Sequence, residues 1–365
     1  MKFKIIREDF LQPLQLVVGV VERRQTLPIL SNVLIVLKDN YLSLTGTDLE
    51  VEIVGHIKLH GAEDDGEITV PARKLMDICK SLPEATEITF NEKDEKVQIV
   101  CGRSRFTLAS LPAAEFPNID EGSTGKDFVI KNLELKQLIS RTSFAMAQQD
   151  VRYFLNGMLL EVDDNRVRAV ATDGHRLAMM DSSKIEINSE KMQAIIPRKA
   201  VIELSRLLLD DGEATVELSD NHMKVVTDGF RFTSKLVDGA YPDYDRVIPK
   251  DGDKKMIGIR EDLQSGFSRA AILSNEKYRG VKLSVAKGLL TLVATNQQEE
   301  AREEVAVTYD SSVLELGFNV SYVIDILNIL SGKEACFTFS DAGSSVLIED
   351  PSHQNAVYVV MPMRL

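Results

Sequence analysis

The sequence has few cysteines, and their positions suit neither a disulfide framework nor a metal site. Cys79, Cys101 and Cys336 are odd in number, lie far apart among the 365 residues and form no Cys-x-x-Cys pair. We therefore expect three reduced core residues in a cytosolic protein, with no bound metal and no cofactor.

Long apolar runs and a basic leader are also missing. The first ten residues, MKFKIIREDF, already reach an acidic pair, so no secretion signal is visible. No apolar run approaches the roughly 20 residues that a membrane span needs. We expect a cytoplasmic protein that has no membrane partner.

Basic residues are outnumbered. The chain has 43 Lys and Arg against 56 Asp and Glu, a formal net charge of -13 at pH 7. This balance argues against a protein that binds nucleic acid over its whole surface, but it leaves room for a local basic surface.

Recognised catalytic motifs are absent. The sequence has no G-x-S-x-G, Walker loop, H-E-x-x-H or dinucleotide fingerprint. One stretch, ATDGHRLA, places Asp173 and His175 close together, and a hydrolase or transferase that uses this pair is one alternative to test. We assign no catalytic residue.

The chain does contain a threefold internal repeat. Thr47-Asp48, Thr172-Asp173 and Thr295-Asn296 each follow an alternating strand pattern, at spacings of 125 and 123 residues. Two helix-like segments recur in each copy, over 8–24 and 72–82, 133–147 and 198–210, and 260–274 and 320–333. The pattern predicts an α+β protein with three repeated domains, 1–124, 125–248 and 249–365, each with two helices on antiparallel sheets.

The repeat weakens the active-site interpretation. The shared Thr-Asp or Thr-Asn pair is typical of a turn in which a short polar side chain bonds nearby backbone N–H groups. Gly174 and His175 occur in the second copy alone, which indicates a local task there.

Positive charge is richer on the predicted helices than elsewhere. The six segments hold 13 Lys and Arg against 10 Asp and Glu, so they carry +3 and the rest of the chain carries -16. Either these charges are simply solvated, or the helices face a polyanion whose phosphates attract them without regard to sequence. The basic candidates are Arg24, Arg73, Lys74, Lys80, Lys136, Arg141, Arg152, Arg198, Lys199 and Arg206. Beside Arg152, the residues Gln148, Gln149, Tyr153 and Phe154 add hydrogen-bonding and stacking groups for a single strand.

Over its whole length the sequence resembles the bacterial DNA polymerase III beta subunits, the beta sliding clamps. The resemblance rests on long motifs in order, including LTGTDLE, VPARK, GRSRFTL, QDVRYFLNGM, ATDGHRLA, FTSKLVDGAYPDY, AAILSNEKYRGV and YVVMPMRL. It implies a DNA-clamp fold closed into a ring by a head-to-tail homodimer, with helices lining the hole. Double-stranded DNA then passes through without being read, and the ring tethers the replicative polymerase in the nucleoid.

The resemblance also implies a groove that takes apolar anchors from partner peptides. Its residues here are Leu155, Thr172, Gly174, His175, Arg176, Leu177, Pro242, Arg246, Val247, Val359, Met361, Pro362 and Met363. The implied partners are the polymerase catalytic subunit, a clamp loader, other DNA polymerases, ligase and mismatch-repair proteins. A scaffold ring that recruits peptides without encircling DNA is the alternative.

The ring implies a subunit interface. Phe106 and Leu108 alternate on a strand of the first domain, while Ile272 and Leu273 end a helix of the third, and the two pairs are candidates to meet across a heterologous contact. At its rim we expect opposite charges, which orient the subunits more than they stabilise them. The charged candidates are Lys74, Arg103 and Arg105 against Glu299, Glu300, Glu303 and Glu304.

Overall fold

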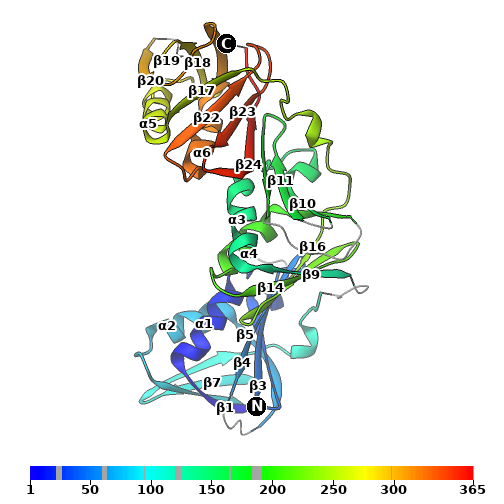
Figure 1. Ribbon diagram of the computed structural model, residues 1–365. Coiled ribbons are helices and arrows are strands. Elements are labelled where there is room, and N and C mark those ends of the chain that lie inside the picture. The colour runs from blue at the N-terminus through cyan, green and yellow to red at the C-terminus, as the bar shows by residue number, and fades with distance from the viewer. Residues whose placement is uncertain are drawn as a thin grey trace. The chain divides into compact units, whose positions relative to one another are not determined.

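The computed structural model describes residues 1–21, 27–59, 64–93, 95–119, 125–163, 166–182, 191–296 and 298–364 (Figure 1). The chain forms two compact units. Unit 1 contains Met1–Leu133 and Ile202–Leu236, and unit 2 contains Glu134–Val201 and Val237–Leu365.

Unit 1 holds two antiparallel sheets. The larger has eight strands in the order β5-β2-β3-β4-β16-β15-β14-β9, and the smaller has four in the order β1-β6-β7-β8. In sheet order, the larger contains β5 Gly66–Pro71, β2 Asn32–Lys38, β3 Tyr41–Thr47, β4 Val51–Lys58, β16 Phe230–Lys235, β15 His222–Val226, β14 Glu213–Leu218 and β9 Lys126–Lys131. The smaller contains β1 Lys2–Ile6, β6 Glu87–Lys93, β7 Lys96–Cys101 and β8 Ser104–Ala109.

Unit 2 is built in the same way. Its eight-stranded sheet runs β13-β10-β11-β12-β24-β23-β22-β17, and its four-stranded sheet runs β20-β19-β18-β21. The larger contains β13 Met192–Pro197, β10 Gly157–Asp163, β11 Arg166–Thr172, β12 Arg176–Asp181, β24 His353–Val360, β23 Val346–Asp350, β22 Glu334–Phe339 and β17 Lys254–Ile259. The smaller contains β20 Glu300–Ala306, β19 Leu289–Thr295, β18 Gly280–Ala286 and β21 Leu314–Asn319.

The described residues form six α-helices, close to the six predicted segments. They are α1 Arg7–Val18, α2 Ala72–Ser81, α3 Asn132–Thr142, α4 Arg198–Leu207, α5 Arg260–Ala271 and α6 Val320–Ile329. Each is shorter at its C-terminal end than predicted. The first ends at Val18 because the chain turns at Gly19 and Val20, and the third passes into a 3-10 turn at Ser143. No helix in these ranges combines the length and apolar content of a membrane-spanning segment.

The strand order confirms the three α+β repeats. The series β1-β6-β7-β8 returns as β9-β14-β15-β16 and as β17-β22-β23-β24, and the series β5-β2-β3-β4 returns as β13-β10-β11-β12 and as β21-β18-β19-β20. Neighbouring repeats share sheets through the pairs β4–β16 and β12–β24. Because both compact units take part of the second repeat, the predicted boundaries at 124/125 and 248/249 stay predictions.

One backbone hydrogen bond recurs at the start of the first helix of each repeat. The amide of the first helical residue donates to a carbonyl beyond the second helix, in the pairs Arg7–Thr86, Asn132–Gly212 and Arg260–Lys333. The side chains of Arg7 and Arg260 also donate to Cys79 O and Leu327 O in the last turns of α2 and α6. A guanidinium there satisfies free carbonyls and suits the negative end of the helix dipole. Equivalent positions in the three repeats therefore make the same backbone contact although their residue types differ.

Helix α1 packs closely on β3 and β4, and a glycine permits the approach. A Cβ atom on Gly46 would lie 2.5 Å from the carbonyl oxygen of Val17, far inside contact distance. Backbone atoms cannot move away as the end of a flexible side chain can, so any side chain at this position pushes α1 from the sheet.

We predict that Gly46→Ala lowers the free energy of unfolding by about 1–3 kcal/mol, the usual cost of overpacking a core. Denaturant unfolding of the full chain measures it. Gly229→Ala is the matched control, because no atom lies within 4 Å of a Cβ there. Equal stability of the two variants would contradict the close-packing explanation.

Candidate functional site

The stretch from Thr172 to Arg176 forms a tight turn between β11 and β12. Asp173 Oδ1 accepts hydrogen bonds from the backbone amides of His175 and Arg176, at 2.9 and 3.0 Å. Thr172 Oγ1 accepts from Gly174 N and donates to Arg176 O. Gly174 has φ +89°, a conformation that glycine adopts without steric cost.

The same turn occurs in the other repeats. In the first, Asp48 Oδ1 accepts from the amides of Glu50 and Val51. In the third, Asn296 Oδ1 accepts from the amides of Gln298 and Glu299. The threonine-aspartate signature is therefore turn chemistry in all three copies, and Asp173 is occupied in holding the backbone.

Arg176 connects this turn to two other elements. Its guanidinium donates to Asp325 Oδ2 on α6 at 2.5 Å, to Asp173 Oδ2 at 3.1 Å and to the carbonyl of Phe144 at 2.8 Å. It also lies between two rings, 4.6 Å from the centroid of Tyr322 and 5.3 Å from that of Phe144. Arg176 is thus held rigidly in place.

His175 is exposed beside this anchor. Its ring stacks on Tyr322 with centroids 6.4 Å apart and planes inclined by 15°. Its carbonyl accepts a hydrogen bond from Met361 N at 2.9 Å, which ties the C-terminal segment to the turn. Met361, Pro362 and Met363 are all half-buried.

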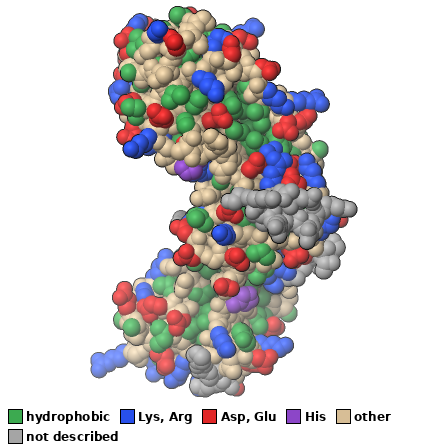
Figure 2. All heavy atoms as spheres, in the orientation of Figure 1, with side chains coloured by type: hydrophobic (Ala, Val, Ile, Leu, Met, Phe, Trp, Pro, Cys, Tyr) green, Lys and Arg blue, Asp and Glu red, His purple; other side chains and the backbone are tan. Residues whose placement is uncertain are grey.

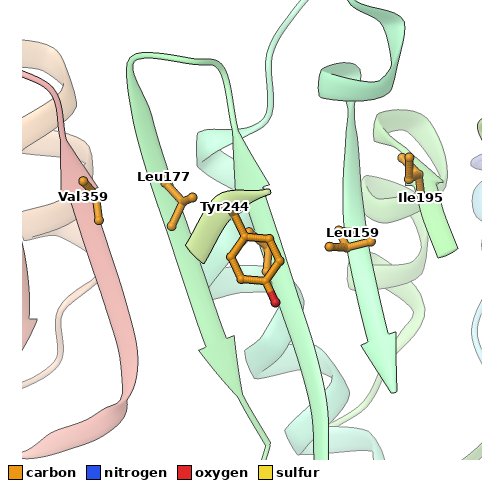
Figure 3. Close-up of a cluster of buried hydrophobic side chains, with 6 residues drawn as sticks. Leu159, Leu177, Ile195, Tyr244 and Val359 are labelled. Carbon is orange, nitrogen blue, oxygen red and sulfur yellow. The ribbon is translucent and has the colours of Figure 1, made fainter. Parts of the chain in front are cut away.

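An apolar cluster lies next to the turn (Figure 3). Leu177 on β12 and Val359 on β24 face the same side of the sheet, and Tyr244 lies over neighbouring strands. The buried members are Leu159, Val170, Leu177, Ile195, Tyr244 and Val359. Partly buried residues around them are Phe154, Met179, Val237, Tyr241, Val247, Ile248 and Leu347. The structure thus gathers Leu177, Val247 and Val359 of the predicted groove in one place.

The remaining predicted groove residues differ in exposure. Leu155 is buried in the 3-10 turn Tyr153–Asn156. Pro242 is exposed, and Arg246 is 85 % exposed and paired with Asp243 at 2.7 Å. Pro242 and Arg246 are therefore accessible from solvent, whereas Leu155 contributes to packing.

Sequence reasoning missed three residues that shape this surface. The hydroxyl of Tyr241 accepts from Thr172 N at 3.1 Å, and burial raises the pKa of that phenol above its ordinary value. Tyr322 and Asp325 on α6 were also missed. Their spacing of three residues, which places them on one helix face, was the signal that could have found them.

Most arginines predicted to contact DNA already donate to protein acceptors. Arg73 donates to Val21 O, and Arg198 donates to Met146 O. Arg152 pairs with Asp150, which lowers the pKa of that carboxyl to about 2. Arg206 pairs with Glu203 and donates to Leu16 O at the end of α1.

The other DNA candidates are placed variously. Lys199 is half-buried, Gln149 is exposed with φ +56° and Tyr153 is 57 % exposed. Phe154 packs on the apolar cluster described above. Arg24 lies outside the described residues. With the observed helix bounds, the six helices hold 11 Lys and Arg against 8 Asp and Glu, so the predicted excess of +3 persists. On the face that Figure 2 shows, acidic and basic side chains are interspersed.

The interface candidates lie on or next to the edge strands β8 and β20, at the end of α5 and, for Lys74, on α2. Phe106 is half-buried and Leu108 is 8 % exposed on β8, while Ile272 just after α5 is 75 % exposed and Leu273 is half-buried. Lys74, Arg103 and Arg105 are exposed, as are Glu299, Glu300 and Glu304. Glu303 already pairs with Arg269 at 2.7 Å, which lowers the pKa of its carboxyl.

No group of three or more potential metal ligands gathers in the described part of the chain. Cys79, Cys101 and Cys336 are all buried and free, and burial raises the pKa of the Cys79 thiol to about 12. A thiol in that state is a poor nucleophile.

Three repeats joined edge to edge through shared sheets define a clamp-type fold. Profiles of the DNA polymerase III beta subunit match the chain in order: the N-terminal domain over residues 1–120, the central domain over 129–243 and the C-terminal domain over 245–364. The beta sliding clamp of Pseudomonas aeruginosa is 55% identical over 367 residues, covering 100% of both chains.

Solved structures agree. A crystal structure of the Pseudomonas aeruginosa DNA polymerase sliding clamp with ligand has a TM-score of 0.98 at 54% identity, and one bound to griselimycin has a TM-score of 0.96 at 55% identity. Both comparisons cover 100% of each chain. The chain therefore belongs to the DNA polymerase III beta subunit family, the beta sliding clamps. It is a non-catalytic processivity subunit, so the hydrolase or transferase alternative is wrong.

We predict that Asp173→Ala lowers the free energy of unfolding by about 1–2 kcal/mol, because the turn loses its side-chain acceptor. Asp173→Asn should recover most of this loss, since its amide oxygen still accepts from both backbone amides. Asp48→Ala in the first repeat is the matched comparison and should cost a similar amount. Chemical denaturation measures all three, and a loss confined to the first repeat would contradict the shared role.

Proposed function

We propose that two copies of this chain close head to tail into a ring that encircles double-stranded DNA and tethers DNA polymerase III to it. The order of the strands within the sheets is the observation that supports this proposal. Strand β4 pairs with β16, and β12 pairs with β24. Their third-repeat and first-repeat counterparts, β20 and β8, stand at sheet edges with one described neighbour each. A second copy supplies the missing partner for each edge, and two such contacts close a ring.

The observed junction supplies a register for the proposed one. Phe106 stands opposite Ile99 as Phe232 stands opposite Val225, so β8 corresponds to β16 residue by residue. Glu300 stands opposite Thr295 as Glu52 stands opposite Thr47, so β20 corresponds to β4. The chain has an ion pair between Arg231 and Glu52 at 3.7 Å. By analogy with this pair, we propose that Arg105 meets Glu300 of the partner subunit.

The proposed contact has an apolar part as well. Ile272 exposes 75 % of its surface at the end of α5, so covering it in an interface would be favourable. Leu108 is already buried within its own unit, so Phe106 is the better candidate to meet Ile272 and Leu273. Charges of opposite sign on β8 and β20 would set the orientation of the two subunits.

DNA binding without base recognition fits the charge pattern. Positive charge in excess on the helices attracts phosphates along any sequence and permits sliding. Arg152 and Arg206 still have N–H groups that can donate to phosphate oxygens, but Asp150 and Glu203 partly balance their charge. This predicts weak contact with the double helix, so retention depends on encirclement. The exposed Tyr153 beside Arg152 is suited to stack on a single strand.

The turn surface and its apolar cluster support the second half of the proposal. A half-exposed apolar patch next to the rigid Arg176 suits an extended peptide with hydrophobic anchors. We propose that polymerases, a clamp loader, ligase and mismatch-repair proteins share this surface, and that griselimycin binds it. Such a role belongs to a cytoplasmic, nucleoid-associated protein.

We predict that the wild-type chain sediments as a dimer and that Ile272→Ala combined with Leu273→Ala gives monomers. After loading by a clamp-loader complex with ATP, the wild type should stay on nicked circular DNA and leave once the circle is linearised. The double variant should not be retained, because its ring does not close.

Val313→Ala controls for loss of an exposed apolar side chain, since Val313 is 66 % exposed. An intact dimer of the double variant would refute this interface. A wild-type dimer that leaves closed circles as fast as linear DNA would favour a scaffold ring without DNA encirclement.

We predict that His175→Ala weakens griselimycin binding by about fivefold or more, because an exposed aromatic contact beside a rigid anchor is lost. Isothermal titration calorimetry on the full chain measures it. His222→Ala is the control, since His222 lies in unit 1. Equal affinity of the two variants would remove His175 from the binding surface.

A further inference from the structure

Unit 1 contains a cavity of about 830 Å³ where the first repeat meets the second. One wall comes from β1, α1 and β4, and includes Ile6, Asp9 and Leu16. The opposite wall comes from the end of α4, from β14 and from the turn before β16, and includes Leu209 and Asp228. Its volume is in the range of ligand sites, which favour domain junctions.

Exposed apolar side chains line this cavity. Leu209 is 68 % exposed and Ile6 is 42 % exposed, from opposite walls. A large aliphatic side chain left in water at a concave site is a favourable contact for an apolar group, at roughly 25 cal/mol per Å² of surface covered.

The corresponding place between the second and third repeats carries different side chains. Arg141 occupies in α3 the position that Leu16 occupies in α1. Ser331 likewise occupies after α6 the position that Leu209 occupies after α4. Arg141 Nη2 donates to Ser331 Oγ at 3.2 Å. At these two positions unit 2 has side chains joined by a hydrogen bond, whereas unit 1 has two leucines, and its cross-junction hydrogen bonds come from Arg206 to Leu16 O and Gln15 O. The fold itself therefore does not fix the chemistry of this junction.

The charge of the cavity is acidic. Five carboxylates line it against two lysines, Lys4 and Lys58, and Lys4 pairs with Glu87 at 3.2 Å. Among the described residues, no ion pair occupies the other four carboxylates, those of Asp9, Asp211, Glu213 and Asp228. Burial lowers the pKa of His56, and the charge of Arg231 acts in the same direction, so this lining imidazole is neutral at pH 7.

We infer that this cavity is a second docking site, distinct from the surface around His175, for a basic amphipathic peptide segment of a partner protein. Aliphatic side chains of the segment contact Leu16 and Leu209, and its Lys or Arg side chains pair with Asp211 and Asp228. The site lies within one chain, so it stands whether or not the ring closes.

The test uses the full chain and the peptide acetyl-Arg-Leu-Arg-Leu-amide. Methyl NMR of leucine and isoleucine should show saturable shifts at the cavity methyls, and calorimetry gives the affinity. Leu209→Ser, and separately Asp211→Asn with Asp228→Asn, should each weaken binding by roughly fivefold, a loss near 1 kcal/mol. Leu209 is exposed, so its replacement leaves the fold intact, and Val313→Ser is the matched control.

Two further probes separate the contributions. Acetyl-Glu-Leu-Glu-Leu-amide should not bind if charge complementarity operates, and acetyl-Arg-Ser-Arg-Ser-amide should bind more weakly if the leucines matter. Equal binding of all three peptides, shifts outside the cavity, or affinity unchanged in the cavity variants would overturn the proposal. Spermidine binding there as tightly as the peptide would assign the cavity to small cations and also overturn it.

Discussion

Antiparallel pairing between edge strands of neighbouring repeats is the constraint on which the rest of the structure depends. An unpaired strand edge exposes a row of backbone donors and acceptors, and a neighbouring repeat satisfies them. In this chain β4 meets β16 and β12 meets β24, so two eight-stranded sheets cross the limits of the repeats. Compact units and repeats consequently do not coincide, although each repeat keeps its own pair of helices. The same rule leaves β8 and β20 as edges that a second copy can satisfy.

The turn at His175 shows how copies of one structural element diverge in their surroundings. In all three copies a short polar side chain holds the turn by accepting hydrogen bonds from backbone amides. The second copy adds Gly174 and His175, and it links Arg176 to Asp325 on α6. A rigid polar anchor beside an apolar cluster is what an adaptable peptide surface requires, since the anchor fixes register while apolar contacts tolerate variation.

The cavity of unit 1 follows from the same comparison of equivalent positions. Repeats that share a backbone differ in the side chains at their junctions: Leu16 and Leu209 line the cavity of unit 1, where unit 2 has the hydrogen bond between Arg141 and Ser331. Junctions are therefore places where one repeat protein can acquire several binding surfaces.

The sequence by itself determined the α+β class, the three repeats, the six helices and the turn at Thr172, because these depend on local periodicity and on side chains that bond their own backbone. The long motifs also sufficed to indicate the family. The tertiary structure alone decided that Arg73, Arg152 and Arg206 are occupied by protein acceptors, and that Phe154 belongs to the apolar cluster. Tyr241, Tyr322 and Asp325 likewise gain their roles from residues distant in sequence. Such contacts depend on which helix ends and strands the shared sheets bring together, and no local pattern records that geometry.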